Sequence, residues 1–356
     1  MKGIKRMGIL TGGGDCPGLN AAIRAATKTA IHKFGLEVYG IRDGFLGALE
    51  GRFQKLEYDH VSGILTRGGT ILGSNNRVDP FQFGPDKQDL SERCLDNLQQ
   101  QKIEALLVLG GDGTLTIAHK FLQKGLLLVA VPKTIDNDVH QTEWTIGFHS
   151  ASAVAGQAID ALHSTAESHH RVMVVEVMGR HTGWIALYAG VASGGDVILI
   201  PEIPCDTEKI CGIIKERDKR GRTFSIVVVA EGTRNQGEMV IKREVAESPE
   251  KIRLGGVGRV IADKIEDQTG KEARVVILGH LQRSGVPVDF DRLLATQFGE
   301  KGVKLLTEGR FGQMTAYRCG EVVSVDLSAV ARGPKLVPLD HPLLETARCI
   351  GTSFGA

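Results

Sequence analysis

The sequence predicts an α/β fold that consists of two doubly wound, Rossmann-like domains, each with three layers. Short aliphatic runs recur along the chain, and a glycine-rich or polar cluster follows each of them. Such runs are typical of buried strands in parallel sheets, and their alternation with helical segments is typical of doubly wound folds. The length of 356 residues exceeds one ordinary hydrophobic core, which favours two domains.

Local patterns predict the individual elements. The predicted strands occupy residues 7–10, 105–109, 126–131, 171–177, 225–230 and 274–278. Alanine and aliphatic residues at helical spacing predict helices over 17–34 and 149–163. Proline, glycine and asparagine residues in 73–85 indicate a loop. No low-complexity linker separates the domains, so we expect ordered chain to cross their boundary near Ile146 and again near Leu281.

Composition argues against several classes of function. A formal net charge of +1 provides no global field that would attract nucleic acid or an anionic membrane. No stretch approaches the roughly 18 apolar residues that a membrane helix needs. The six cysteines are scattered without a CxxC pair, which argues against a zinc or disulfide framework. We therefore expect a cytoplasmic protein.

Two glycine clusters, 12–14 and 110–114, follow predicted strands. Backbone N–H groups in a glycine turn before a helix can bind phosphate, although a tight strand-to-helix turn also explains the first cluster. In the second cluster, Asp112 offers carboxylate oxygens suited to Mg²⁺, or it caps the helix that follows. Ligands bind beyond the carboxyl ends of parallel strands, so the two clusters together favour a phosphate site.

A third cluster, 134–138, follows the next aliphatic run and contains Asp136 and Asp138. In an extended segment, carboxylates two residues apart face the same side. One could accept a proton from a substrate hydroxyl while the other assists a metal ion or its waters. The alternative is an Asx-rich turn. With the glycine clusters, this pattern predicts phosphoryl transfer.

Basic residues lie at the starts or ends of predicted strands. They are Arg171, Arg180, Arg274, His280 and Arg283. Guanidinium groups match the geometry of a phosphate monoester, although a surface ion pair explains any one of them alone. Glu231 follows another predicted strand and could accept a hydrogen bond from a sugar hydroxyl or cap a helix.

Six motifs, taken together, resemble those of the 6-phosphofructokinases. They are 11–20, 67–70 with 72–74, 110–114, 132–138, 178–180 and 279–283, in the family's order. The resemblance extends from about residue 7 to about residue 306, whereas 322–356 matches poorly and receives no predicted role. It implies an ATP-dependent glycolytic enzyme that phosphorylates fructose 6-phosphate at O1 to give fructose 1,6-bisphosphate.

The resemblance also implies how the chain is divided. A domain of residues 1–146 plus about 282–318 would bind the phosphoryl donor and Mg²⁺. A second domain of residues 147–281 plus about 319–356 would bind fructose 6-phosphate. The active site would lie in the cleft between these domains.

Site residues follow from the same resemblance. The donor would be bound by Gly13, Gly14, Arg77, Gly111, Asp112, Gly113 and Thr114, with Asp112 on Mg²⁺. Asp136 would be the general base, assisted by Thr134, Asp138 and Arg180. The sugar phosphate would be bound by Thr134, Ile135, Asp136, Arg171, Met178, Gly179, Arg180, Glu231, Arg274, His280, Leu281, Gln282 and Arg283. Arg171 and Arg274 would come from a neighbouring subunit, which implies a homodimer or homotetramer.

Two positions bear on the identity of the donor. Pyrophosphate-using members carry a second aspartate where this chain has Gly113, which would repel the α-phosphate of a nucleotide. The same members carry a lysine at the position of Lys133, where the familiar bacterial ATP enzymes carry glycine. The pair of Gly113 and Lys133 resembles a third group of members, which are ATP-dependent. It therefore favours ATP and leaves a pyrophosphate-dependent enzyme as the alternative. A non-catalytic regulatory subunit and a lipid or NAD kinase are further alternatives.

Overall fold

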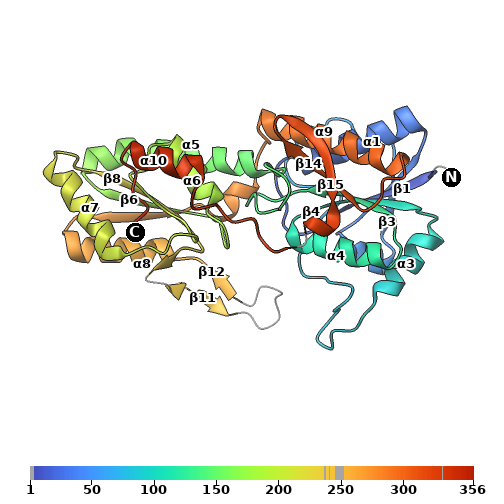
Figure 1. Ribbon diagram of the computed structural model, residues 1–356, viewed down its shortest axis with the longest axis horizontal. Coiled ribbons are helices and arrows are strands. Elements are labelled where there is room, and N and C mark those ends of the chain that lie inside the picture. The colour runs from blue at the N-terminus through green and yellow to red at the C-terminus, as the bar shows by residue number, and fades with distance from the viewer. Residues whose placement is uncertain (1–3, 236–237, 240, 245–251, 331) are drawn as a thin grey trace. The chain divides into compact units, whose positions relative to one another are not determined.

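The computed structural model describes residues 4–235, 238–239, 241–244, 252–330 and 332–356. The chain divides into two compact units (Figure 1). Unit 1 comprises Met1–Ser150 and Arg283–Pro334, and unit 2 comprises Ala151–Gln282 and Lys335–Ala356.

Unit 1 is built on a seven-stranded sheet with the order β15-β14-β5-β4-β1-β2-β3. Its strands are β1 (Arg6–Thr11), β2 (Glu37–Ile41), β3 (Phe53–Leu56), β4 (Ala105–Gly110), β5 (Leu128–Pro132), β14 (Gln313–Arg318) and β15 (Glu321–Asp326). The central strands pair in parallel, and β3 and β15 are antiparallel edges. Every residue of β4 and β5 is buried, as expected for strands covered on both faces.

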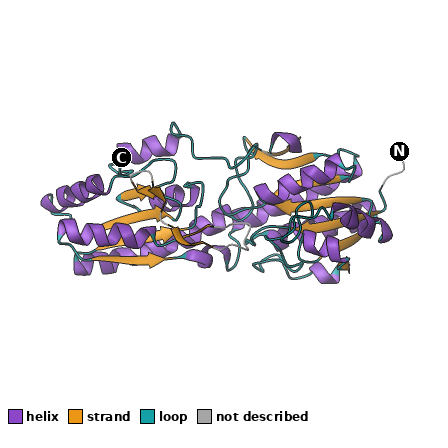
Figure 2. Ribbon diagram, turned by 90° about the horizontal axis from the view of Figure 1, so that it is seen from below, coloured by secondary structure: helices purple, strands orange, loops and turns teal. Residues whose placement is uncertain are grey.

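Helices cover both faces of this sheet, which gives unit 1 three layers (Figures 1 and 2). They are α1 (Leu19–Phe34), α2 (Phe45–Glu50), α3 (Ser91–Gln100), α4 (Asp112–Gln123) and α9 (Asp289–Thr307), with short 3₁₀ helices η1 (Asp59–Val61) and η3 (Leu327–Ala329). Figure 1 shows α1 and α9 on one face and α3 and α4 on the other. The predicted α/β class with parallel sheets is therefore confirmed.

Unit 2 contains a four-stranded parallel sheet with the order β13-β6-β8-β7. Its strands are β6 (Val172–Val177), β7 (Val197–Leu199), β8 (Ser225–Ala230) and β13 (Ala273–Ile277). Its helices are α5 (Phe148–His169), α6 (Trp184–Ala192), α7 (Thr207–Lys219), α8 (Val257–Thr269), α10 (Pro342–Cys349) and the 3₁₀ helix η2 (Gly279–Arg283). The first three residues of α5 and the last residue of η2 belong to unit 1. Two further antiparallel pairs join β9 (Arg234–Asn235) to β10 (Glu238–Met239) and β11 (Ile241–Glu244) to β12 (Ile252–Leu254).

We expected residues 319–334 to belong to the second domain, but they belong to unit 1. Strand β15 pairs with β14 in antiparallel register, from Gln313 opposite Asp326 to Arg318 opposite Glu321. The two residues between these strands, Cys319 and Gly320, both have positive φ. Positive φ at both central residues is the geometry of a tight hairpin, so the chain returns along the same sheet.

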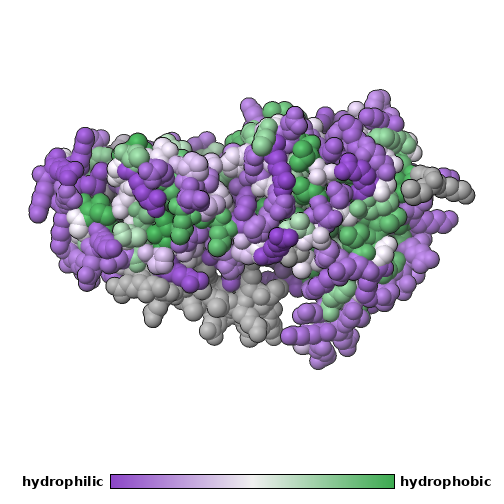
Figure 3. Space-filling model, in the orientation of Figure 1, coloured by the Kyte–Doolittle hydropathy of each residue, from purple (hydrophilic) through white to green (hydrophobic). Residues whose placement is uncertain are grey.

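None of the described helices is long and apolar enough to cross a membrane. In the face of the molecule drawn in Figure 3, hydrophilic side chains dominate and apolar ones reach the surface in separate small clusters.

The side chain of His149 lies in an aromatic cluster at the start of α5. Its ring centroid lies 4.7 Å from that of Trp144 and 4.2 Å from that of Phe290. Burial lowers the pKa of His149 from 6.5 to about 4. The positive end of the helix dipole also disfavours a cation at this position.

Replacing His149 by phenylalanine is expected to protect the fold against acid. A lowered folded-state pKa means that the unfolded chain takes up the proton first, so stability is lost as pH falls from 6.5 toward about 4. This penalty amounts to about 2 kcal/mol near pH 5. The melting temperature of His149→Phe minus that of wild type should therefore increase as the pH is lowered from about 7.5 to about 5. A difference that does not change with pH would contradict this assignment.

Candidate active site

Three chain segments meet at the carboxyl-terminal edge of the unit 1 sheet. Parallel pairing places Thr11 opposite Leu109 and Gly110 opposite Pro132. Beyond the strands, the N–H of Gly12 donates to the carbonyl of Leu109 at 2.9 Å, and the N–H of Lys133 donates to that of Gly110 at 2.9 Å. The three clusters predicted from the sequence therefore leave the sheet side by side.

The glycine turn after β1 is held by a neighbouring loop. Gly13 has a φ of 78°, in the left-handed region, and its N–H donates to the carbonyl of Asn75 at 3.1 Å. The hydroxyl of Ser74 donates to the carbonyl of Gly13 at 2.5 Å. Arg77 lies exposed in the same loop, and its N–H donates to the Asn75 side chain. The contact between Asn75 and the glycine turn was not predicted from the sequence, which indicated only that Asn75 lies in the loop 73–85.

Lys133 lies behind the glycine turn and is 2% exposed. Its Nζ donates to the carbonyl of Gly12 at 2.8 Å and to the carbonyl of Gly14. Burial lowers the pKa of this ammonium group below its usual value. The side chain therefore connects the carbonyls of Gly12 and Gly14 to the residue that follows β5.

Arg283, expected among the sugar-phosphate residues, lies against the same turn in unit 1. Its NH1 donates to the carbonyl of Asp15 at 3.0 Å. A Cβ built on Gly14 would lie 2.4 Å from this NH1 atom, so the guanidinium packs directly on the glycine backbone. The turn is thus approached by two cationic side chains, Lys133 and Arg283.

The second glycine cluster brings α4 close to the first. A Cβ on Gly110 would lie 2.3 Å from the Cβ of Thr114, and one on Gly12 would lie 2.7 Å from its Cγ2. Asp112 is the first residue of α4 and Gly111 is the N-cap, so Asp112 does not cap this helix. A Cβ on Gly113 would meet nothing within 4 Å, and a side chain there would enter open space.

The third cluster is a turn and not an extended segment. Asn137 has a φ of 51° and is buried. Its side-chain oxygen accepts from the N–H of Thr145 at 3.1 Å, and its amide donates to the carbonyl of Glu143 at 3.0 Å. Sequence reasoning missed this anchoring role, although asparagine tolerates left-handed backbone better than most residues. Within the turn, the N–H of Asp136 donates to the hydroxyl of Thr134 at 3.2 Å, so the acidic pair lies on a turn that Thr134 and Asn137 hold in place.

The carboxylates of the second and third clusters influence one another. The pKa of Asp138 is raised to about 7, mainly by burial and in addition by the charges of Asp136 and Asp112. One oxygen of Asp138 is buried with no hydrogen-bond partner among the described residues. Mutually repelling carboxylates with an unsatisfied oxygen fit a cation.

No group of three or more acidic, histidine or cysteine side chains in the described part of the chain forms a complete metal cage. Mg²⁺ in phosphoryl-transfer sites is usually held by one or two carboxylates together with water and substrate phosphates. The residues present therefore fit Mg²⁺ that arrives with a phosphorylated ligand.

In unit 2, the loops after β6, β8 and β13 are joined by backbone and side-chain hydrogen bonds. The N–H of Glu231 donates to the carbonyl of Val177 at 2.9 Å, and that of Gly232 donates to Gly179 at 3.0 Å. The N–H of Met178 donates to the buried side chain of Gln282 at 3.3 Å.

These bonds bring together most of the predicted sugar-phosphate residues of unit 2. The group contains Met178, Gly179, Arg180, Glu231, His280, Leu281 and Gln282. A Cβ on Gly232 would lie 2.0 Å from the carbonyl oxygen of Arg180, so the two loops pack backbone to backbone. His280 and Leu281 are exposed on η2.

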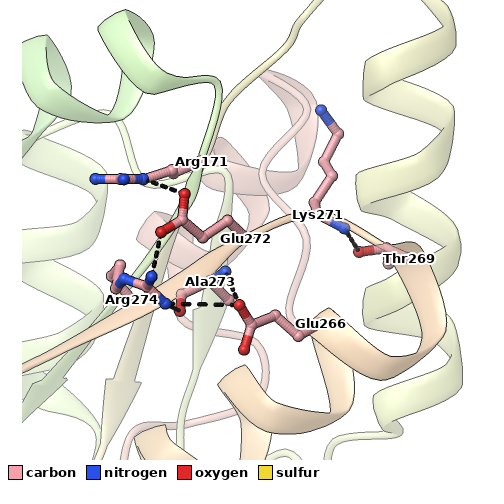
Figure 4. A network of polar contacts seen from close by, with 7 residues as sticks. All are labelled: Arg171, Glu266, Thr269, Lys271, Glu272, Ala273 and Arg274. Atoms are coloured by element: carbon pink, nitrogen blue, oxygen red, sulfur yellow. Dashed lines mark hydrogen bonds and ion pairs between the residues drawn. The ribbon is translucent and has the colours of Figure 1, made fainter.

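Two predicted residues, Arg171 and Arg274, lie at the amino-terminal ends of β6 and β13, away from these loops. Figure 4 shows both guanidinium groups on the carboxylate of Glu272. The Nε of Arg171 donates to Glu272 at 2.6 Å, and this bond lowers the pKa of Glu272 below its usual value. Arg274 also lies 3.6 Å from Glu266. The structure therefore does not bring these two arginines to the site loops of their own chain.

A cavity of 930 Å³ lies at the amino-terminal edge of the unit 1 sheet and is lined by none of the predicted site residues. Its lining includes Arg6, which pairs with Glu37, and Lys124, which pairs with Glu92 at 2.6 Å. Because these cations already have carboxylate partners, we place the candidate site at the carboxyl-terminal edge.

Comparisons with known proteins identify the family of the chain. The ATP-dependent 6-phosphofructokinase of Spirochaeta thermophila is 49% identical over 99% of this chain and 98% of that protein. The pyrophosphate–fructose 6-phosphate 1-phosphotransferase of Streptomyces coelicolor is 47% identical over 98% of this chain and 100% of that protein.

A crystal structure of Pichia pastoris phosphofructokinase in the T-state matches with a TM-score of 0.82 and 31% identity. The match covers 93% of this chain and 36% of that one, so this chain spans about a third of its length. The family model described as phosphofructokinase matches residues 6–306. The resemblance inferred from the six motifs is thus confirmed, and the chain belongs to the phosphofructokinase family.

Proposed function

We propose that this chain is an ATP-dependent 6-phosphofructokinase, which transfers the γ-phosphoryl group of ATP to O1 of fructose 6-phosphate. The observation that carries this proposal is the cluster of Asp112, Asp136 and Asp138 beside the glycine turn. Burial, and after it the charges of Asp136 and Asp112, raise the pKa of Asp138, so these three carboxylates influence one another. The name of the full-length Spirochaeta thermophila relative supports ATP as donor.

The residues of unit 1 would divide the chemistry among them. Asp136 would accept the proton of the O1 hydroxyl as that oxygen attacks the γ-phosphorus, while the bond from this phosphorus to the β–γ bridging oxygen breaks and ADP leaves. Thr134 would bind the transferred group. The N–H groups of the glycine clusters would hold the donor phosphates, except those of Gly12 and Gly13, which already donate to the carbonyls of Leu109 and Asn75. Asp112, assisted by Asp138, would hold Mg²⁺, which neutralises charge on those phosphates when it is bound.

The residues of unit 2 would bind and orient the sugar phosphate. Arg180 would contact the transferred group, and Glu231 would accept hydrogen bonds from sugar hydroxyls. Arg171 and Arg274 would complete the site of a neighbouring subunit, since they lie apart from the loops of their own chain. The enzyme would then be a homodimer or homotetramer, and we place it in the cytoplasm.

A second candidate function is the pyrophosphate-dependent reaction. The name of the Streptomyces coelicolor relative favours it, and so does the presence of Lys133. We prefer ATP for two structural reasons. The position of Gly113 is open, which leaves room for the α-phosphate of a nucleotide. The ammonium group of Lys133 is engaged by the carbonyls of Gly12 and Gly14.

Asp136→Asn tests the catalytic assignment. An amide cannot accept the hydroxyl proton, so kcat for fructose 1,6-bisphosphate formation should fall at least about 100-fold. The KM for fructose 6-phosphate should stay within about threefold, because the shape of the side chain is kept. The matched control is Asp160→Asn on the exposed surface of α5. A near wild-type kcat in Asp136→Asn would refute the role.

Gly113→Asp tests the choice of donor. The new side chain enters open space at the start of a helix, where a carboxylate is tolerated. Its charge should lower kcat/KM for ATP at least about tenfold, with little change in melting temperature. Gly113→Ala is the control and should retain most ATP activity. Unchanged ATP kinetics in the aspartate variant would argue against this role for Gly113.

Lys133→Met tests whether the buried lysine acts through the glycine turn. Two carbonyls would lose their donor, at a cost of about 1–3 kcal/mol for each buried group. We expect a lower melting temperature and a KM for ATP raised at least about tenfold, more than the KM for fructose 6-phosphate. Lys55→Met, at an exposed position, is the control. Normal stability with a selective loss of pyrophosphate turnover would instead indicate direct donor contact.

A further inference from the structure

The C-terminal segment of the chain is built into unit 2. The N–H of Ile198 donates to the carbonyl of Ser353 at 2.8 Å, and the N–H of Asp206 donates to that of Gly355 at 2.8 Å. Phe354 between them is buried. This segment lies beyond residue 306, where the match to the family model ends. The family match therefore assigns no role to this segment.

The first part of this segment, residues 335–341, contacts the loop 178–183 through Glu202. The Oε1 atom of Glu202 accepts from the N–H of Val337 at 2.9 Å and from the N–H of Gly183 at 3.1 Å. Gly183 is the last residue of the loop that carries Met178, Gly179 and Arg180. One carboxylate thus joins the C-terminal segment to a loop of the candidate site.

A second contact lies one residue further along, at Trp184. Its Nε1 donates to the carbonyl of Lys335 at 3.0 Å. The ring of His341 meets the indole edge-to-face, with centroids 5.2 Å apart and an interplanar angle of 84°. The segment 335–341 is therefore held at both of its ends against the start of α6.

The loop has little freedom to move at Gly183 while these contacts last. A Cβ on Gly183 would lie 2.3 Å from the Cβ of Ile200 and 3.0 Å from Oε2 of Glu202, so the backbone packs closely on both residues. Glu202 is half-buried, so its N–H partners matter, because a partly desolvated carboxylate without hydrogen bonds is costly. The opposite side of the loop is fixed by Gly232 and Gln282.

We propose that residues 335–341 position the loop 178–183 for the sugar phosphate, and that Glu202 is the positioning residue through which they do so. The assignment of fructose 6-phosphate to this loop rests on the proposed function. The coupling between the segment and the loop rests on the contacts alone.

The experiment compares Glu202→Ala, Glu202→Gln and the control Glu345→Ala on the exposed face of α10. Alanine removes the acceptor for both N–H groups, so the KM for fructose 6-phosphate should rise at least about fivefold, with kcat and the KM for ATP within about twofold. Glutamine keeps one carbonyl oxygen for both N–H groups and should restore most of the affinity. If Glu202→Ala does not fold, Trp184→Phe serves as the test in its place. It removes the Nε1 donor to Lys335 and should raise the same KM.

Hydrogen exchange of the same proteins without substrate gives an independent readout. In Glu202→Ala, exchange should rise in peptides from both 178–184 and 335–341, and it should stay unchanged in Glu345→Ala. An unchanged KM would overturn the proposal, and so would an equal loss in every kinetic parameter without rescue by glutamine. If wild type does not phosphorylate fructose 6-phosphate, the proposed function fails. The joint rise in exchange then still supports the coupling, and its absence overturns it.

Discussion

Parallel pairing of β1, β4 and β5 is the constraint on which the candidate site of unit 1 depends. The register sets Thr11 beside Leu109 and Gly110 beside Pro132, so three strands end at one level. Because parallel strands must be buried on both faces, their side chains are mostly aliphatic, and most of the polar residues lie in the loops beyond them. The chemistry of this unit is therefore concentrated at one edge of its sheet.

Buried and half-buried polar side chains then fix the loops that leave the two sheets. Lys133 holds two carbonyls of the glycine turn, and Asn137 holds the acidic turn. In unit 2, Gln282 and Glu202 each accept backbone N–H groups from the loop 178–183. Each of these groups would be costly to bury without its partner, so each bond favours one loop conformation. Rigid loops of this kind suit phosphoryl transfer, in which positioning supplies much of the catalysis.

The fold class and the glycine clusters could be predicted from sequence because aliphatic runs and glycines act locally. The roles of Lys133 and Arg283 could not, since the direction of a long side chain depends on backbone that is distant in sequence. The pairing of β15 with β14 in unit 1 was not predicted, because a Cys-Gly turn is a weak sequence signal for a hairpin. Glu202 gave no signal, because its partners Gly183 and Val337 contribute only backbone N–H groups.

The most direct test of the account is fructose 1,6-bisphosphate formation by the wild-type protein, with ATP and pyrophosphate supplied separately at equal Mg²⁺. We expect turnover with ATP and a kcat/KM for pyrophosphate at least about tenfold lower. That result would mean that the open position at Gly113 decides the donor while Lys133 serves the glycine turn. Turnover mainly with pyrophosphate would contradict the account.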